Sequence, residues 1–409
     1  MKFFRVFFVS ALCLTIVGMS AAQLPSETLS PEFTQLAELT ASDAAHLDFV
    51  GVSVAISSDG NTVAVGMGST HTPGAVYVYT KPASGWTSMT QVAKLTASDG
   101  TANNYLGYSV AISGNAIVAG APNSNDYSGA AYVFVKPTGG WTNMTQTAEL
   151  TASGPNQGLG NSVAISGNAV VAGSPDGSNG EPGAAYVYVK PATGWKNMMQ
   201  TARLTASDGL DYDGFGQTVA MSANTVVVGT LGRQIAYLFV QPMSGWANGT
   251  QTAKLTAPTT SFSVGVSGNG VVVGDPYVTV GSNQYQGAAY VFVEPAQGWK
   301  DMPSTATLTA SDGASQDEFG YAVTINGNQI FVGSPFARIG SNSDQGAAYQ
   351  YTKPSTGWKT TSHFNAKLVA SDGAKDDELG WSLSFGGNLL LVGAPGHTSQ
   401  QGAAYLFTP

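Results

Sequence analysis

Short stretches in which apolar and polar residues alternate recur along almost the whole chain. The clearest example is GYSVAISGNAIVAGAP, at residues 107–122. Its segment 109–113 alternates small polar with apolar side chains, which is typical of a β-strand with two different faces. The Gly-Asn pair at 114–115 suits a tight hairpin turn, because both residue types tolerate positive φ. Segment 116–120 is continuously apolar and indicates a strand buried on both faces.

The pattern repeats seven times. The shortest step between the starts of successive copies is 51 residues and the longest is 60. A Leu-Thr-Ala-Ser tetrad, or a close variant of it, begins at Leu39, Leu95, Leu150, Leu204, Leu255, Leu308 and Leu368. A Gly-Trp pair follows the same spacing, with Trp86, Trp141, Trp195, Trp246, Trp299 and Trp358. A repeat of this length with strand-like patterning predicts the blades of a β-propeller.

Each copy contains four predicted strands, which we name A to D. Strands A and B are the pair described above, strand C has the form GAAYVFV (129–135), and strand D carries the Leu-Thr-Ala-Ser tetrad. The last copy ends after its strand C at Pro409, and an unused D strand lies at 35–42. The sequence therefore predicts an all-β, seven-bladed propeller of four antiparallel strands per blade over 35–409. Its ring is closed when strand 35–42 joins the C-terminal blade, which leaves few exposed edges.

The N-terminus differs in kind from the repeats. Lys2 and Arg5 precede an apolar run at 6–19, and small residues follow at 20–22. This order predicts a secretory signal peptide at 1–22, with a short leader at 23–34. The apolar run is too short to predict insertion in a membrane. We therefore expect a protein that is secreted, periplasmic or held at the cell surface.

The net charge of the chain limits the classes of molecule that it is expected to bind. The chain has 16 Lys and Arg against 25 Asp and Glu, and removing Lys2 and Arg5 with the signal takes the net charge from −9 to −11. An acidic chain is repelled by nucleic acid and by anionic membranes. We expect a monomer that meets a glycan or a protein at the cell exterior.

The unit G-x-S-V-A-I-S-G-N-x-x-x-x-G-A-P resembles the FG-GAP repeat, known from the integrin α-subunit propeller and from exported bacterial proteins. Phe-Gly stands at 215–216 and 319–320, and Gly-Ala-Pro at 120–122 and 393–395. The resemblance implies a seven-bladed propeller, in agreement with the strand count. Integrin-type repeats often hold calcium in the A–B hairpin. Here that hairpin is a two-residue turn, which cannot supply six to eight oxygen ligands, so these calcium sites are not carried over.

Two copies depart from the repeat. The fourth lacks the proline and the Gly-Ala pair, at 229–236, and the fifth lacks the acidic D–A loop, at 257–262. One interpretation is drift in a tolerant repeat. The other is a local binding notch, because the two changes alter one sector of the rim.

The B–C and D–A loops should share one face of the propeller, and they vary between copies, as binding loops do. The A–B and C–D turns are nearly uniform, and their Gly-Trp pairs are interpreted as packing anchors. Aromatic, amide and carboxylate side chains on the variable face suit a hydroxyl-rich ligand or a protein partner, although such residues also fill ordinary loops. The candidate ligand-binding residues are Asp126, Tyr127, Tyr212, Tyr277, Tyr285, Phe336 and Arg338.

Metal binding is the second question raised by this face. Acidic D–A loops recur at 208–213, 312–318 and 372–378, and they are read either as capped turns or as calcium loops. Ring closure should also bring His46, His71 and His397 to one blade seam. They are interpreted either as unrelated surface histidines or as a zinc-type or acid/base site. We predict no cofactor, with calcium as the alternative.

No catalytic motif stands out, since the chain has no G-x-S-x-G, H-E-x-x-H or phosphate loop. The leading prediction is an exported binding module that recognises a surface glycan or protein through the B–C and D–A face. One alternative is a polysaccharide-acting hydrolase or lyase, which needs a carboxylate pair whose separation a sequence does not show. The other is a structural component of the cell exterior.

Overall fold

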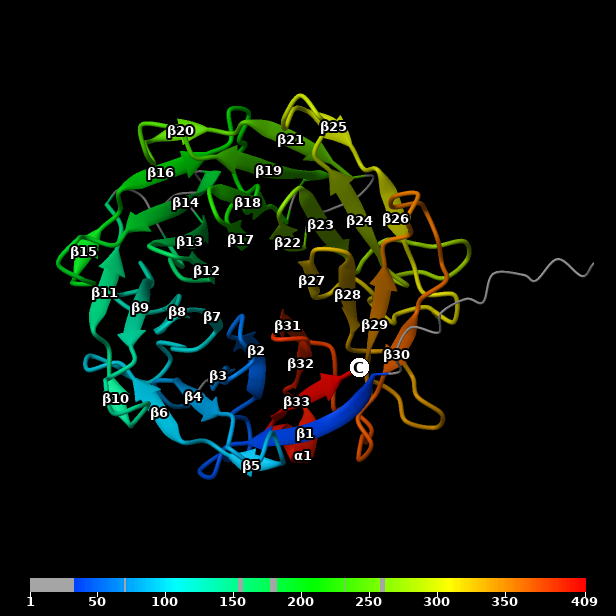
Figure 1. Ribbon diagram of the computed structural model, residues 1–409, viewed down its shortest axis with the longest axis horizontal. Coiled ribbons are helices and arrows are strands. Elements are labelled where there is room, and N and C mark those ends of the chain that lie inside the picture. Colours follow the sequence, from blue (N-terminus) through cyan, green and yellow to red (C-terminus); the bar gives the residue numbers. More distant parts are fainter. Residues whose placement is uncertain (1–32, 70, 154–156, 177–181, 232, 258–261) are drawn as a thin grey trace, which may run out of the picture. The chain divides into compact units, whose positions relative to one another are not determined.

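The structure of the protein is a computed structural model that describes residues 33–69, 71–153, 157–176, 182–231, 233–257 and 262–409. The described chain from Phe33 to Pro409 forms one compact unit. Within that unit seven sheets follow one another around a ring (Figure 1). The predicted seven-bladed propeller is confirmed. None of the described helices is long and apolar enough to cross a membrane.

Each blade is described from the axis of the ring outward. Blade 1 comprises β2 (Val50–Ile56), β3 (Thr62–Met67), β4 (Ala75–Thr80), β6 (Ala93–Thr96) and β10 (Met144–Thr145). Blade 2 comprises β7 (Ser109–Ser113), β8 (Ala116–Ala121), β9 (Ala130–Val135), β11 (Ala148–Thr151) and β15 (Met198–Met199). Blade 3 comprises β12 (Ser162–Ser166), β13 (Ala169–Asp176), β14 (Pro182–Val189), β16 (Ala202–Thr205) and β20 (Gly249–Thr250). Blade 4 comprises β17 (Thr218–Ser222), β18 (Thr225–Gly229), β19 (Ile235–Val240), β21 (Ala253–Thr256) and β25 (Met302–Pro303).

The remaining blades follow the same plan. Blade 5 comprises β22 (Ser263–Ser267), β23 (Gly270–Asp275), β24 (Ala288–Val293) and β26 (Ala306–Leu308). Blade 6 comprises β27 (Val323–Asn326), β28 (Gln329–Ser334), β29 (Ala347–Thr352) and β30 (Ala366–Leu368). Blade 7 comprises β31 (Ser382–Gly386), β32 (Leu389–Ala394), β33 (Ala403–Thr408), β1 (Thr34–Thr40) and β5 (Met89–Thr90). A helical turn, α1 (His397–Gln400), lies in the B–C loop of blade 7.

The first strand closes the ring. Strand β1 pairs antiparallel with β33, from Thr34 opposite Thr408 to Leu39 opposite Ala404. In Figure 1 the blue β1 lies beside the red β33, so the two ends of the described chain share one sheet. Ring closure by the N-terminal strand was predicted from the missing D strand of the last repeat, and it is confirmed.

A fifth, two-residue strand was not predicted, and it joins neighbouring blades. In blade 7 it is β5, which runs parallel to β1 and pairs Met89 with Leu39. A glutamine that follows this strand fastens the same seam. Gln91 Oε1 accepts a hydrogen bond from the Ser42 N–H, and its Nε2 donates to Ser42 Oγ, both at 2.9 Å. Thus the C–D turn of each such blade is attached to the outer strand of the blade before it.

The Phe-Gly and Gly-Ala-Pro glycines meet at the contact between blades. The Gly120 backbone lies so close to Gly160 of the next blade that a Cβ on Gly120 would be 1.8 Å from Gly160 O. The Ser109 hydroxyl donates to the same carbonyl at 2.8 Å. The core continues through this seam, with Val118 and Val133 of blade 2 in one cluster with Tyr186 and other residues of blade 3. The repeated motif therefore sets the spacing between blades.

The Gly-Trp pair packs at the face of the propeller that carries the A–B and C–D turns. Trp86 is 4% exposed, and its indole N–H donates to the carbonyl of Gly60 in the A–B turn at 2.9 Å. Its bond to a turn of the same blade matches the predicted role of a packing anchor.

Candidate functional site

The B–C and D–A loops lie on one face, as predicted. The end of each of five B–C loops forms a single bridge with the end of the adjoining D–A loop, for example Gly287 with Phe319 and Gly346 with Leu379. The other face holds the two kinds of turn, and the Lys81 N–H donates to the carbonyl of Asn61 there. The variable loops therefore form a continuous rim around the axis.

Side chains next to the Phe-Gly glycines line the mouth of the axial channel on this rim. The cavity there is about 330 Å³ and is bordered by the innermost strands of all seven blades. Its aromatic part consists of Tyr108, Phe262, Tyr321 and Trp381, and its amide part of Asn161 and Gln217. The channel mouth thus combines ring faces with hydrogen-bonding groups.

The fifth repeat supplies one of these rings by replacing a glycine. The N–H of Phe262 donates to Gly274 O at 3.0 Å, as the N–H of Gly320 does to Gly333 O in the next blade. Phe262 therefore occupies the position that glycine holds in the other repeats, and its ring lies at the channel mouth. The loss of the motif in this copy places an aromatic ring at the channel mouth, which favours the notch interpretation for the fifth repeat.

The rings of blades 5, 6 and 7 form one connected aromatic cluster. Tyr321 is at its centre, with its ring centroid 4.9 Å from Phe262 and 4.6 Å from Trp381. Tyr277 packs edge-on against Phe262 at 5.6 Å and is 44% exposed. The full aromatic cluster is Tyr277, Tyr285, Phe262, Tyr321, Phe336 and Trp381. The structure brings together three of the predicted residues, Tyr277, Tyr285 and Phe336.

Two glutamates stand beside this cluster in a cleft of about 1020 Å³ that Tyr285 and Phe336 also line. Glu318 and Glu378 hold equivalent places in successive D–A loops, both at positive φ. Their backbone N–H groups are fixed by the carbonyls of Tyr285 at 3.0 Å and Asp344 at 2.9 Å. The side chains are thereby directed by the loops rather than by strand geometry.

The surroundings of both glutamates raise the pKa of their side chains. Burial raises the pKa of Glu318 to about 7. Burial also raises the pKa of Glu378 to about 7, with a further contribution from the carboxylates of Asp344, Asp376 and Asp377. A carboxyl group with such a pKa exists in both forms near neutrality, so it can donate a hydrogen bond as well as accept one.

The other predicted residues lie elsewhere on the rim. Asp126 and Tyr127 line a separate cavity of about 350 Å³ between blades 1 and 2. Tyr212 is 81% exposed, and Arg338 is also exposed. Tyr321 and Trp381 were not predicted. Phe262, Glu318 and Glu378 lie in loops that the sequence analysis singled out, but they were not among the candidate ligand-binding residues. The sequence contains a pattern that could have identified the channel mouth, because the residue after the Phe-Gly glycine varies from copy to copy in an otherwise constant repeat.

Six segments of the chain match the FG-GAP repeat: residues 33–79, 89–134, 144–188, 198–239, 303–351 and 363–407. The chain belongs to the FG-GAP repeat family. The matches leave out residues 240–302, which include β22, β23 and β24 of the divergent blade 5. No curated protein matches the FG-GAP chain significantly. Among solved structures, the crystal structure of the computationally designed Ika8 protein is similar, with a TM-score of 0.50 and 15% identity. The alignment covers 92% of this chain and 99% of that one.

In the acidic D–A loops of the FG-GAP repeats, a carboxylate caps a turn. Asp317 Oδ2 accepts a hydrogen bond from the Ala314 N–H at 2.8 Å, and Asp377 Oδ2 accepts one from the Ala374 N–H at 2.7 Å. These contacts support the interpretation as capped turns. Among the residues that the structure describes, the acidic triads at 208–213 and 312–318 do not bring three carboxylates to within 4.8 Å of one another.

The three predicted histidines are placed differently from one another. His46 Nδ1 is 2.8 Å from the carbonyl oxygen of Ser399 in α1, so the loops of the first and last blades do meet. His397 turns away from that contact and pairs with Asp377 Oδ2 at 3.0 Å. His71 is exposed, and its backbone N–H is bonded to Ser69 Oγ. Only His397 belongs to a described group that could hold a metal ion.

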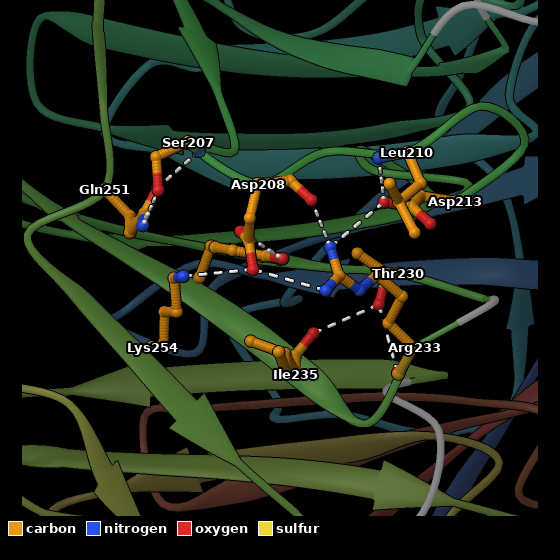
Figure 2. Close-up of polar contacts among 10 residues, drawn as sticks. Ser207, Asp208, Leu210, Asp213, Thr230, Arg233, Ile235, Gln251 and Lys254 are labelled. Atoms are coloured by element: carbon orange, nitrogen blue, oxygen red, sulfur yellow. Dashed lines mark hydrogen bonds and ion pairs between the residues drawn. The ribbon is translucent and has the colours of Figure 1, made fainter.

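In the divergent fourth FG-GAP repeat, the side chain of an arginine links the B–C loop to the D–A loop (Figure 2). Arg233 lies in the short B–C loop, where its guanidinium is 3.2 Å from Asp208 Oδ2 and 3.3 Å from Asp213 Oδ2. Lys254 reaches the same Asp208 oxygen at 3.0 Å, and Asp213 also caps the Leu210 N–H. Arg233 therefore joins two loops, and the fourth copy has a structural replacement rather than a notch.

Replacing Arg233 by alanine is expected to lower the free energy of unfolding by roughly 2 kcal/mol, because partly buried charge-assisted hydrogen bonds are lost. Arg338→Ala is the matched control, since that arginine lies exposed in the B–C loop of blade 6 and should change stability by less than about 0.5 kcal/mol. Chemical denaturation of both variants measures the difference. Equal effects would mean that Arg233 does not hold the loops together.

Proposed function

We propose that this FG-GAP propeller is an exported module that binds a hydroxyl-rich glycan at the mouth of its axial channel. The observation that carries the proposal is that one aromatic cluster connects the channel mouth to the cleft that holds Glu318 and Glu378. Its rings Tyr321 and Trp381 line the mouth, and its rings Tyr285 and Phe336 line the cleft. Ring faces stack on the apolar faces of sugars, and amide or carboxyl groups bond to the hydroxyls. Export is part of the proposal and rests on the signal-like residues 1–22.

A second candidate function is supported by the same glutamates. A carboxylic acid with a pKa of about 7 is suited to protonate a glycosidic oxygen, and a second carboxylate completes the pair used in glycoside hydrolysis. The enzyme would use the cleft that the binding module uses. The two functions therefore differ in their products and not in their location.

Retention on a panel of soluble polysaccharides, with release of products measured in parallel, tests both candidates. We expect retention at pH 6 without products. Trp381→Ala should weaken it by about 30-fold, since buried aromatic anchors carry most of the binding energy in such sites. Tyr127→Ala is the matched control, because Tyr127 is an exposed ring on the same rim outside the aromatic cluster.

The outcomes separate the candidates. Product release that is lost in Glu318→Gln would replace the binding module by the enzyme. No retention on any polysaccharide, or equal losses in Trp381→Ala and Tyr127→Ala, would overturn the glycan site and direct the search to a protein partner.

A further inference from the structure

A repeated ion pair marks the outer edge of several blades. The first aspartate of a D–A loop pairs with a lysine of the following strand D: Lys94 with Asp43 at 2.6 Å, and Lys367 with Asp312 at 2.7 Å. The lysines hold the same register, since Lys94 is opposite Tyr77 and Lys367 is opposite Tyr349. Each pair balances one negative charge with one positive charge.

The blade that closes the ring breaks this rule. The residue opposite Tyr405, in the register of the lysines, is Glu38 of β1, and the aspartate of the preceding loop is Asp372. Two carboxylates thus stand where blades 1, 4 and 6 have a carboxylate and an ammonium group. His397 of α1 enters the gap, with its Nε2 3.6 Å from Glu38 Oε1.

We propose that Glu38, Asp372 and His397 bind a divalent metal ion of the zinc class at the ring closure. One ligand atom from each residue lies within 4.8 Å of the others. Ligands about 2.0–2.1 Å from a tetrahedral zinc ion are about 3.3 Å apart, so the His397 to Glu38 spacing already fits and Asp372 needs only a small movement. An imidazole ligand favours zinc over calcium and magnesium.

The surroundings of His397 prepare it as a ligand. Its Nδ1 is 3.0 Å from Asp377 Oδ2, which leaves Nε2 free to face Glu38. A histidine that is oriented by a carboxylate through its second nitrogen is the usual arrangement around protein-bound zinc. The side chains of Glu38 and His397 are 27% and 13% exposed, so an ion can enter from solvent.

The position of the site gives it a consequence. In the other blades a C–D turn connects the outermost long strand covalently to strand C, whereas β1 is held to β33 only by non-covalent contacts. An ion shared by β1, the loop before blade 7 and the loop that carries α1 would fasten the two ends of the chain. We therefore expect zinc to stabilise the closed ring.

Zinc titration of the purified full-length chain, stripped of metal by a chelator, tests the site. We expect one zinc ion per chain and an increase in the melting temperature that saturates with that stoichiometry. Zinc should also slow amide exchange in β1 more than it slows exchange in β18 of blade 4. Glu38→Lys should abolish zinc binding while it preserves the fold, because it recreates the pair formed by Lys94 and Asp43. His397→Gln should abolish zinc binding as well.

Two control variants keep the result specific. Glu149 has the same register in blade 2, opposite Tyr132, and its neighbour is Asn125 instead of a histidine, so Glu149→Gln should bind zinc normally. His46→Gln should also bind zinc normally, since its ring contacts Ser399. Zinc that is still bound by Glu38→Lys or His397→Gln, or zinc that is not bound by the unaltered chain, would overturn the proposal.

Discussion

Gly120→Ala is expected to lower the free energy of unfolding by about 4 kcal/mol. The added Cβ would be 1.8 Å from Gly160 O and 2.4 Å from Ser109 Oγ. The first of these atoms belongs to the backbone of the next blade, so it cannot rotate away. Relief requires the two blades to separate, and this breaks the Ser109 hydrogen bond and the apolar contacts behind it.

Gly139→Ala is the matched control. A Cβ at Gly139 meets nothing within 4 Å, and its backbone is not in the left-handed region, so alanine should be tolerated. Urea denaturation of the two variants, followed by tryptophan fluorescence, gives the comparison. A loss below about 1 kcal/mol in Gly120→Ala would show that the glycine contact does not set the blade spacing.

The fold could be predicted because its information is repeated and local. Period-two alternation, the Gly-Asn turns and the tetrads define each strand, and the unused D strand at 35–42 defines the closure. The two-residue strands were not predicted, because Met89 and Thr90 form a strand only through their pairing with the neighbouring blade. A pairing between blades has no periodicity within its own segment.

The candidate site was only partly predictable, for a related reason. Tyr277, Tyr285 and Phe336 were recognised because they lie on variable loops. In the sequence Tyr321 and Trp381 continue the alternation of strand A as sheet residues do, but the preceding glycines, at φ of +100° and +101°, turn them toward the channel mouth. The acidity of Glu318 depends on burial by loops from two blades, and loop conformation does not follow from a single repeat.

The double variant Glu318→Gln/Glu378→Gln is expected to be more stable than the unaltered protein at pH 8.5 by about 3 kcal/mol, and nearly equal to it at pH 4. Both glutamates have a pKa of about 7 in the folded chain, against 4.5 for a free side chain. The folded state therefore holds more protons than the unfolded state, and stability falls as the pH rises from about 4.5 to 7. Allowance for partial exposure leaves roughly 1.5 kcal/mol for each glutamate.

Denaturation of both proteins across this range measures the difference, and subtraction cancels every other titrating group. The variant Asp59→Asn tests the opposite direction of pH-dependent stability. A hydrogen bond from the Ser57 hydroxyl lowers the pKa of Asp59, so its removal should destabilise the protein at pH 8.5 and not at low pH. A difference between the double variant and the unaltered protein that does not change with pH would show that the cleft does not perturb the glutamates.

The same titration links stability to ligand binding. A neutral glycan that covers the cleft removes more water from Glu318 and Glu378, which raises the pKa of each carboxyl further and favours its protonated form. Retention should therefore be strongest below pH 7 and should weaken by about tenfold for each pKa unit of that additional increase. The double glutamine variant should bind with an affinity that does not vary with pH, because its amides cannot ionise. A glycan that binds better at pH 8.5 would instead require charged glutamates and would favour a cationic ligand over a neutral one.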